Sequence, residues 1–125
     1  MRKFYLLYFA ESGRLKGFYS ELRKAFGRTP EPLLEITHDV MGDFRLSWLE
    51  AVDKLGVPVE YYFRDEVPER LNDWLHTHHV ALPAVVGLSA AGGNVLVASA
   101  DDLKGIRGQV EMLVEKLQNV LKTGS

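Results

Sequence analysis

The sequence predicts an α/β fold in which helices cover both faces of a mixed central sheet. Short apolar runs rich in aromatic and β-branched residues alternate with stretches whose apolar residues recur every three or four positions. Near the end of the chain, two strand-like runs are separated only by Ala-Ala-Gly-Gly-Asn, which is typical of a hairpin. Strands joined through helices run parallel, whereas a hairpin adds an antiparallel strand. The expected order is therefore β-α-β-α-β-α-β-β-α.

The first half of the chain is expected to alternate between strands and helices. Residues 3–10 (KFYLLYFA) are aromatic and leucine-rich, as in a buried strand. The apolar residues of 12–27 share one helical face, and Ser12 is a candidate N-cap. The run 33–40 (LLEITHDV) is predicted to be the second strand.

A helix and a third strand are expected next. Asp43 is placed to cap a helix whose apolar residues are spaced by three and four as far as Gly56, which ends it. The third strand is predicted over 57–63 (VPVEYYF). Only alternate side chains of a strand face the same layer, so the exposed set is expected to include Tyr62.

The last part of the chain is predicted to form a short helix, a hairpin and a long helix. The helix covers 69–79 (ERLNDWLHTHH), and the hairpin joins 83–89 (PAVVGLS) to 94–99 (NVLVAS). Residues 103–120 carry the longest helical periodicity in the sequence, although glycines in its first turns weaken it.

Length and composition favour one globular domain. The chain has 125 residues, of which 46% are hydrophobic and 26% charged. We expect a single domain over 1–125 with the last few residues disordered. No run approaches the roughly 18 apolar residues of a membrane span. The cytoplasm is the default location.

Charge and cysteine content exclude several function classes. Fifteen basic and seventeen acidic residues give a net charge of −2, which offers no electrostatic basis for binding nucleic acid or an anionic membrane. The absence of cysteine excludes disulfides, thiolate nucleophiles and thiolate metal sites. The glycine-containing segments lack the spacing of phosphate-binding loops, so no cofactor is expected.

The second half of the chain resembles the thioredoxin fold. The segments 78–88 (HHVALPAVVGL), NVLVAS and 101–117 (DDLKGIRGQVEMLVEKL) look like the family's short helix, cis-proline strand, hairpin partner and final amphipathic helix. The expected element order is similar to that family over nearly the whole chain. The resemblance implies that the Leu82–Pro83 peptide bond is cis.

The resemblance also identifies a redox-inactive relative. Where the family carries Cys-x-x-Cys, this chain reads ITHDVMGDF (36–44), without cysteine. Such relatives act mostly as non-catalytic scaffolds, chaperones or assembly factors, so a protein or an extended peptide is the expected partner. No catalytic residue is assigned. The resemblance places binding residues in the former redox segment and beside the groove that pairs with an extended peptide: Thr37, His38, Asp39, Gly42, Leu82 and Pro83.

The histidines allow a second class of function. His38 and Asp39 could act as an acid/base pair in a cysteine-independent enzyme or small-molecule binder. The structural interpretation is favoured, because adjacent strand residues point to opposite faces. His76 and His79 share a helical face, but no carboxylate follows at i+4, so no metal site is expected.

Two further hypotheses concern partners. The segment 53–66 (DKLGVPVEYYFRDE) resembles pilus-assembly relatives of the same fold, which suggests an accessory factor of a conjugation or secretion system. In the C-terminal helix, Met112, Val114 and Leu121 widen the apolar stripe. This width allows a homodimer through that helix, although completing the core is the favoured role.

Overall fold

The fold is built on a four-stranded mixed sheet with strand order β2-β1-β3-β4. The computed structural model describes residues 1–11, 31–39 and 42–123, so the helix expected over 12–27 lies outside the described residues. β1 runs parallel to β2, and β3 runs antiparallel to both β1 and β4. The strands are β1 (Lys3–Leu7), β2 (Val59–Tyr62), β3 (Ala84–Leu88) and β4 (Asn94–Ala98).

The central position of β1 follows from its apolar sequence. Phe4 pairs with Val59 of β2 and with Gly87 of β3, so β1 is bonded on both edges. Phe4 and Leu6 are fully buried and belong to one core cluster, whereas Leu7 is fully buried in the other. Side chains therefore leave β1 toward apolar layers on both faces.

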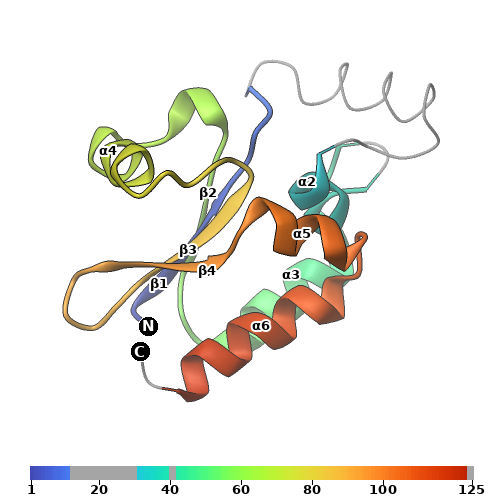
Figure 1. Cartoon of the computed structure of the whole chain (residues 1–125). Helices are drawn as coiled ribbons and strands as arrows, with labels where there is room; N and C mark the ends of the chain where they lie inside the picture. The colour runs from blue at the N-terminus through green and yellow to red at the C-terminus, as the bar shows by residue number, and fades with distance from the viewer. Residues whose placement is uncertain (12–30, 40–41, 124–125) are drawn as a thin grey trace.

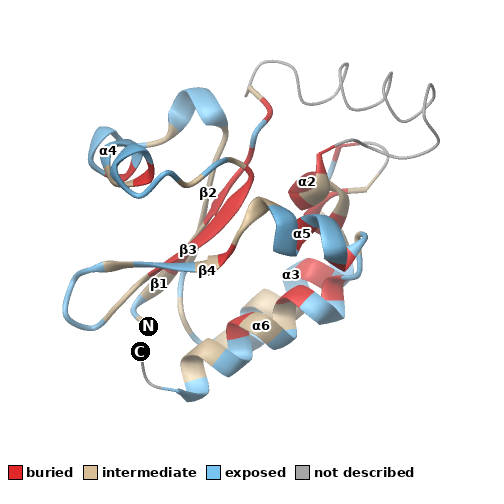
Figure 2. Cartoon of the chain, in the orientation of Figure 1, coloured by how far each residue is buried: buried red, intermediate tan, exposed pale blue. Residues whose placement is uncertain are grey.

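Helices cover both faces of the sheet unequally (Figures 1 and 2). On one face the larger core gathers buried residues of α2, α3, α5 and α6. On the other face α4 packs Leu71 and Leu75 against Leu7 and Val86. The mixed sheet with helices on both faces is therefore confirmed. The helices are α2 (Pro32–Thr37), α3 (Leu46–Leu55), α4 (Glu69–Thr77), α5 (Ala100–Ile106) and α6 (Val110–Lys122), with a 3-10 turn η2 (Arg64–Glu66) before α4.

The strand predicted over 33–40 is wrong, because α2 forms there instead. Glu31 occupies the N-cap position, and its side chain accepts a hydrogen bond from the Leu34 N–H at 2.8 Å. Pro32 follows at the start of the helix, where a missing N–H costs nothing. Among the residues of this segment that the structure describes, strand-like pairing is limited to an isolated bridge between His38 and Phe44.

The long C-terminal helix is also corrected, since α5 and α6 are separate. Arg107 and Gly108 have φ angles of 55° and 74°, which end α5 with two left-handed residues. Ser99 and Asp102 form a capping box at the start of α5. The apolar spacing continues across the break because Ile106 and Val110 both face the core.

Other expectations are confirmed in outline. The hairpin joins β3 to β4, with Gly92 at a φ of 91° in the turn, and Gly56 ends α3 at a φ of 77°. The Leu82–Pro83 peptide bond is cis, as expected. α3 begins later than predicted, with Arg45 rather than Asp43 at its N-cap. Within the described part of the chain, no helix combines the length and apolar character needed to cross a membrane.

Candidate functional site

The two predicted site segments lie on either side of the end of β1. Leu7 pairs with Ala84, which directly follows Pro83. The next residue, Tyr8, places its hydroxyl 2.8 Å from Oγ1 of Thr37. The end of β1 therefore links the segment around Thr37 to the strand that begins after Pro83.

A buried polar network connects Tyr8, Thr37 and His38. Oγ1 of Thr37 lies 2.7 Å from Nδ1 of His38 and 3.2 Å from the Leu33 carbonyl, to which it donates. Tyr8 and Thr37 have no exposed surface, and His38 is 3% exposed. A hydroxyl beside an imidazole is the pairing that activates a nucleophile. Here the hydroxyl is sealed from solvent, so the network fits a structural role.

The His38 ring is enclosed by aromatic side chains. Its centroid lies 4.3 Å from that of Phe44 and 5.7 Å from that of Tyr8. Tyr8 in turn stacks on Phe63 at 5.0 Å. Burial lowers the pKa of His38 to about 4, because the imidazolium would lose its hydration. The ring is therefore neutral near pH 7. Burial raises the pKa of Tyr8 for the same reason, because it disfavours the charged phenolate.

Asp39 and Gly42 form a separate turn. Oδ1 of Asp39 accepts a hydrogen bond from the Asp43 N–H at 3.1 Å, and the Asp39 carbonyl accepts one from the Gly42 N–H at 3.1 Å. Gly42 has a φ of 86°, which a residue without Cβ adopts without strain. His38 and Asp39 thus direct their side chains to different partners, and this divergence counts against an acid/base pair.

Glu31 is a buried acid that the sequence analysis missed. It is 5% exposed, and its carboxylate accepts hydrogen bonds from the Phe9 N–H at 2.7 Å and the Leu34 N–H at 2.8 Å. Burial raises its pKa, although the backbone donors act in the opposite direction. Glu31 therefore fastens α2 to the chain just beyond β1. An acid directly before Pro-Leu-Leu was the available sequence signal.

A cleft of about 300 Å³ opens beside Leu82. Phe9 forms part of its wall and is 53% exposed, with the Arg64 guanidinium 4.9 Å from its ring centre. The same guanidinium contacts Glu11 at 2.6 Å, so its charge is paired. The cleft therefore presents a largely apolar wall, which is made by Phe9, Leu75, Val80, Ala81 and Leu82, with Asn72, His76 and Arg64 at polar positions.

The backbone bordering this cleft has unused hydrogen-bonding groups. Val80 donates its N–H to the Leu75 carbonyl at 2.9 Å. Across the described residues, neither Ala81 nor Leu82 makes a backbone hydrogen bond. Ala81 is exposed and Leu82 half-buried, whereas Pro83 is buried at the head of β3. An extended chain placed here could pair with these groups.

The histidines at the end of α4 do not gather into a metal site. His76, His78 and His79 are exposed. His78 stacks on Trp74 with 4.6 Å between ring centres, and its Nδ1 lies 2.9 Å from the Trp74 carbonyl. No group of three or more histidines and acids suited to a metal ion occurs among the residues described.

Comparison with known proteins adds no relative: no family model, curated protein or solved structure matches the chain. Function must therefore be argued from the geometry of the molecule itself.

Proposed function

We propose that this chain is a cysteine-free, redox-inactive protein of thioredoxin-like fold that binds an extended segment of a partner protein in the cleft beside Leu82. Its role would be that of a binding, chaperone-like or assembly factor. The observation that carries the proposal is the backbone of Ala81 and Leu82, which makes no hydrogen bond within the described part of the chain and borders an open, largely apolar cleft.

The order of the elements supports the proposed fold. A short helix, a cis-proline, a β-hairpin and C-terminal helices follow one another as the resemblance implies. The segment 33–40 departs from it, because a helix replaces the expected strand. We therefore propose the thioredoxin-like fold on the order of the other elements, from the short helix to the C-terminal helices.

Peptide recognition at this place follows from two kinds of contact. Backbone groups of Ala81 and Leu82 can hydrogen-bond to any extended chain, which gives affinity with little dependence on sequence. The wall formed by Phe9 and Leu82 favours a partner that places an apolar side chain into the cleft. Thiol exchange contributes nothing to such binding, since the chain has no cysteine.

Selection from a phage-displayed library of random 12-residue peptides tests the proposal. Enriched peptides should be extended and carry an apolar residue, and they should shift the NMR amide signals of Ala81 and Leu82. Phe9→Ala should weaken their binding about tenfold, because it removes an aromatic wall of the cleft. Leu46→Ala is the matched control, since Leu46 is 70% exposed on α3, outside the residues that line the cleft.

Two outcomes would overturn this function. One is a library selection that enriches no peptide. The other is enriched peptides that bind Phe9→Ala and Leu46→Ala equally well and leave the amide signals of Ala81 and Leu82 unchanged.

Self-association through α6 stays a prediction, as does the accessory role in a conjugation or secretion system. Val114 and Leu121 are partly buried and pack against the larger core. Met112 is 44% exposed and is free of that constraint. A dimer surface on α6 would therefore centre on Met112.

A further inference from the structure

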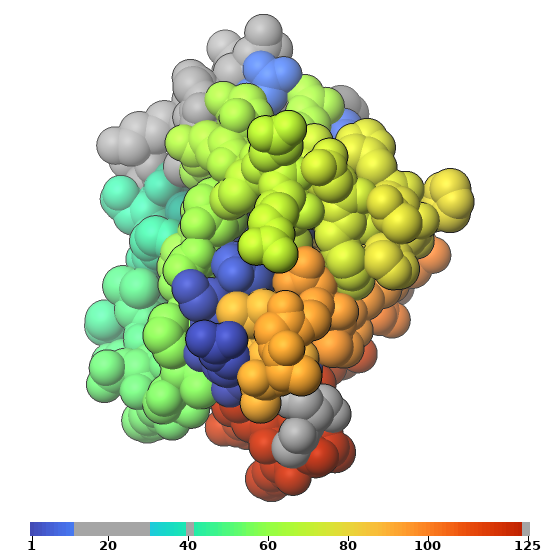
Figure 3. All heavy atoms as spheres, turned by 90° about the vertical axis from the view of Figure 1, so that its left-hand side faces the viewer, coloured from blue at the N-terminus to red at the C-terminus, as the bar shows by residue number. Residues whose placement is uncertain are grey.

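A second cleft, of about 380 Å³, lies on the same face of the sheet as α4. Figure 3 shows this side of the molecule, where the first residues of the chain lie between β2 and the β3–β4 hairpin, below α4. The cleft is lined by residues far apart in the sequence, among them Arg2, Tyr5, Glu60, Tyr62, Arg70 and Leu88. It shares no lining residue with the cleft beside Leu82.

Aromatic and apolar side chains give this cleft a surface for a flat ligand. The rings of Tyr5 and Tyr62 lie side by side, with 6.2 Å between centres and 37° between planes. Both residues are half-buried, so part of each ring is open to solvent. Leu71 and Leu88 add apolar area beside them. Such a surface favours the ring of an aromatic ligand over a hydrated ion alone.

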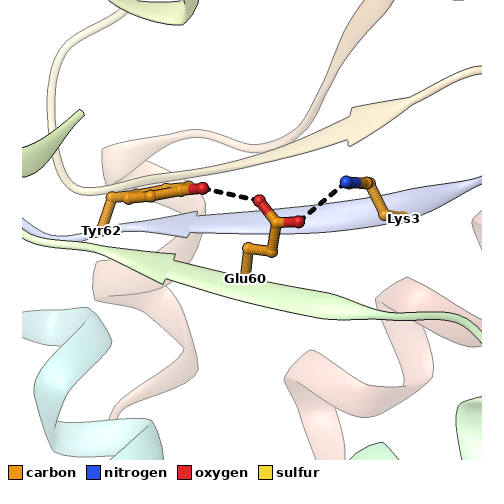
Figure 4. A network of polar contacts seen from close by, with 3 residues as sticks. All are labelled: Lys3, Glu60 and Tyr62. Carbon is orange, nitrogen blue, oxygen red and sulfur yellow. Dashed lines mark hydrogen bonds and ion pairs between the residues drawn. The ribbon is translucent and has the colours of Figure 1, made fainter. Parts of the chain in front are cut away.

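A hydrogen-bonded network fixes the polar groups of the cleft (Figure 4). Oε2 of Glu60 lies 2.7 Å from Nζ of Lys3, and Oε1 accepts a hydrogen bond from the Tyr62 hydroxyl at 2.6 Å. Donation to Glu60 raises the pKa of Tyr62 to about 12. The phenol is therefore neutral near pH 7, and the Glu60 charge is balanced by Lys3.

The remaining charge of the cleft is positive. Arg2 and Arg70 both line it and are exposed. Among the residues with assigned positions, neither guanidinium forms an ion pair with a carboxylate. A guanidinium presents a planar set of donors that matches a carboxylate or a phosphate. Two guanidinium groups that pair with no described carboxylate, beside a balanced Lys3–Glu60 pair, therefore leave a site complementary to an anion.

We propose that this cleft binds a small aromatic ligand that carries an oxyanion, with the ring against Tyr5 and Tyr62 and the oxyanion between Arg2 and Arg70. The volume lies at the lower end of the range for small-molecule sites. Charge and shape act together here, because the rings give contact area and the arginines give selectivity for the anion. This site is independent of the proposed peptide cleft.

Titration calorimetry with six probes tests the site. Indole-3-acetate supplies an aromatic carboxylate and adenosine monophosphate an aromatic phosphate, whereas indole with acetate, and adenosine with inorganic phosphate, supply the separate halves of these two ligands. We expect at least one of the two complete ligands to bind at least tenfold more tightly than either half. Binding should weaken as salt is added, because the guanidinium groups are exposed. The gain in affinity of each complete ligand over its own aromatic half shows which oxyanion the arginines prefer.

Variants locate the binding. Arg2→Gln and Arg70→Gln should each weaken it about tenfold, as expected for loss of a charge-assisted contact. Lys104→Gln is a matched control, because Lys104 is an exposed cation on α5. Phe9→Ala should leave this binding unchanged, which separates it from the peptide cleft.

Three results would overturn the proposal. The first is that neither complete ligand binds at millimolar concentration. The second is that a complete ligand binds no better than its separate halves. The third is that binding survives the loss of both arginines in the double variant.

Discussion

His38 is neutral and buried, and its ring bonds to Thr37 while aromatic rings enclose it. The adjacent His38 and Asp39 suggest an acid/base pair in the sequence, but the His38 pKa of about 4 and the enclosure of its ring fit a packing role. The burial that keeps His38 from contacting a substrate also makes the stability of the fold depend on pH. Its protonation would place an unhydrated charge in the core.

We expect stability to fall as the pH falls because of His38. Between its folded pKa of about 4 and its ordinary value of 6.5, the unfolded chain binds more protons than the folded one. The free energy of unfolding of the wild type, relative to His38→Gln, should therefore decrease by about 2 kcal/mol between about pH 7 and pH 5. Urea unfolding of both proteins measures this difference.

The comparison with His38→Gln is needed because Glu31 acts with the opposite sign. Its raised pKa means that the folded state takes up a proton more readily, so this group adds stability as the pH falls through its folded pKa. The variant retains Glu31 and cancels that contribution. Parallel stability curves for the two proteins would contradict the buried, neutral histidine.

Glu31 itself should be essential as an acceptor more than as a charge. Glu31→Ala leaves the N–H groups of Phe9 and Leu34 without their acceptor and should cost about 2–4 kcal/mol of unfolding free energy. Glu31→Gln keeps one acceptor oxygen, so it should retain one of the two hydrogen bonds and cost less than Glu31→Ala. Urea unfolding near pH 7 compares them. Equal losses in the two variants would contradict the retained hydrogen bond.

At the scale of elements, β1, β2, the hairpin and α4 could be predicted because their patterns agree with their tertiary surroundings. The pattern failed over 33–40, where Leu33 and Ile36 suit a strand and a short helix equally well. There Glu31 favours the helix, because its carboxylate caps α2 at the Leu34 N–H. The same carboxylate also accepts a hydrogen bond from the Phe9 N–H, a partner distant in the sequence that periodicity cannot show. The break at Arg107 was hidden because the apolar spacing continues through it.

The glycines around that break offer a matched pair of substitutions. Gly108 has a φ of 74°, and an added Cβ would approach Cγ of Glu35 to 2.9 Å, so Gly108→Ala should lower the unfolding free energy by about 1–2 kcal/mol. Gly105 lies within α5, with no atom within 4 Å of an added Cβ. Gly105→Ala should therefore raise stability by about 0.5–1 kcal/mol.

Thermal or urea unfolding of both glycine variants checks this pair. If Gly108→Ala were as stable as Gly105→Ala, the left-handed break between α5 and α6 would be absent in solution. A continuous helix over this region, as the periodicity alone predicts, would then be the better description.

The edge strand β4 bears on self-association. It carries no charged residue, and Val95 and Leu96 are 38% and 41% exposed. Successive residues Val85 and Val86 of β3 pair with Ala98 and Leu96, so Val97 is an extra residue in β4. Such a bulge interrupts the regular ladder and protects an edge from pairing with another chain. Association through α6 is therefore easier than through this edge.

At the scale of the whole molecule, α4 separates two candidate binding places. Its first turn contributes Arg70 and Leu71 to the cleft beside Tyr5 and Tyr62, and its later residues Leu75 and His76 line the cleft beside Leu82. The opposite face is closed by α2, α3, α5 and α6 around the larger core. Both proposed binding sites therefore lie on the face of the sheet that α4 covers.

Only part of these sites could be predicted from sequence. Leu82 and Pro83 were found through resemblance, because they belong to one continuous segment. Phe9 and Arg64 of the first cleft come from different segments, as do Arg2 and Arg70 of the second. The spacing of such residues in the sequence carries no signal, since the sheet brings them together only after folding.

A homodimer through α6 can be tested without disturbing the core. Met112 is 44% exposed, so Met112→Glu should leave the melting temperature nearly unchanged while lowering the apparent mass in light scattering at high protein concentration. Val114→Glu should instead destabilise the fold, because Val114 packs against the core. A wild-type protein that stays monomeric at high concentration would contradict the dimer.

In the proposed complex, Ala81 and Leu82 pair with the backbone of the bound chain. Amide hydrogen exchange, followed by NMR with and without a library-selected peptide, tests this pairing most directly. At least one of these two amides should be protected at least tenfold more in the complex, because an N–H that has no acceptor among the described residues gains one. Saturating peptide that leaves both amides exchanging as fast as in the free protein would contradict it.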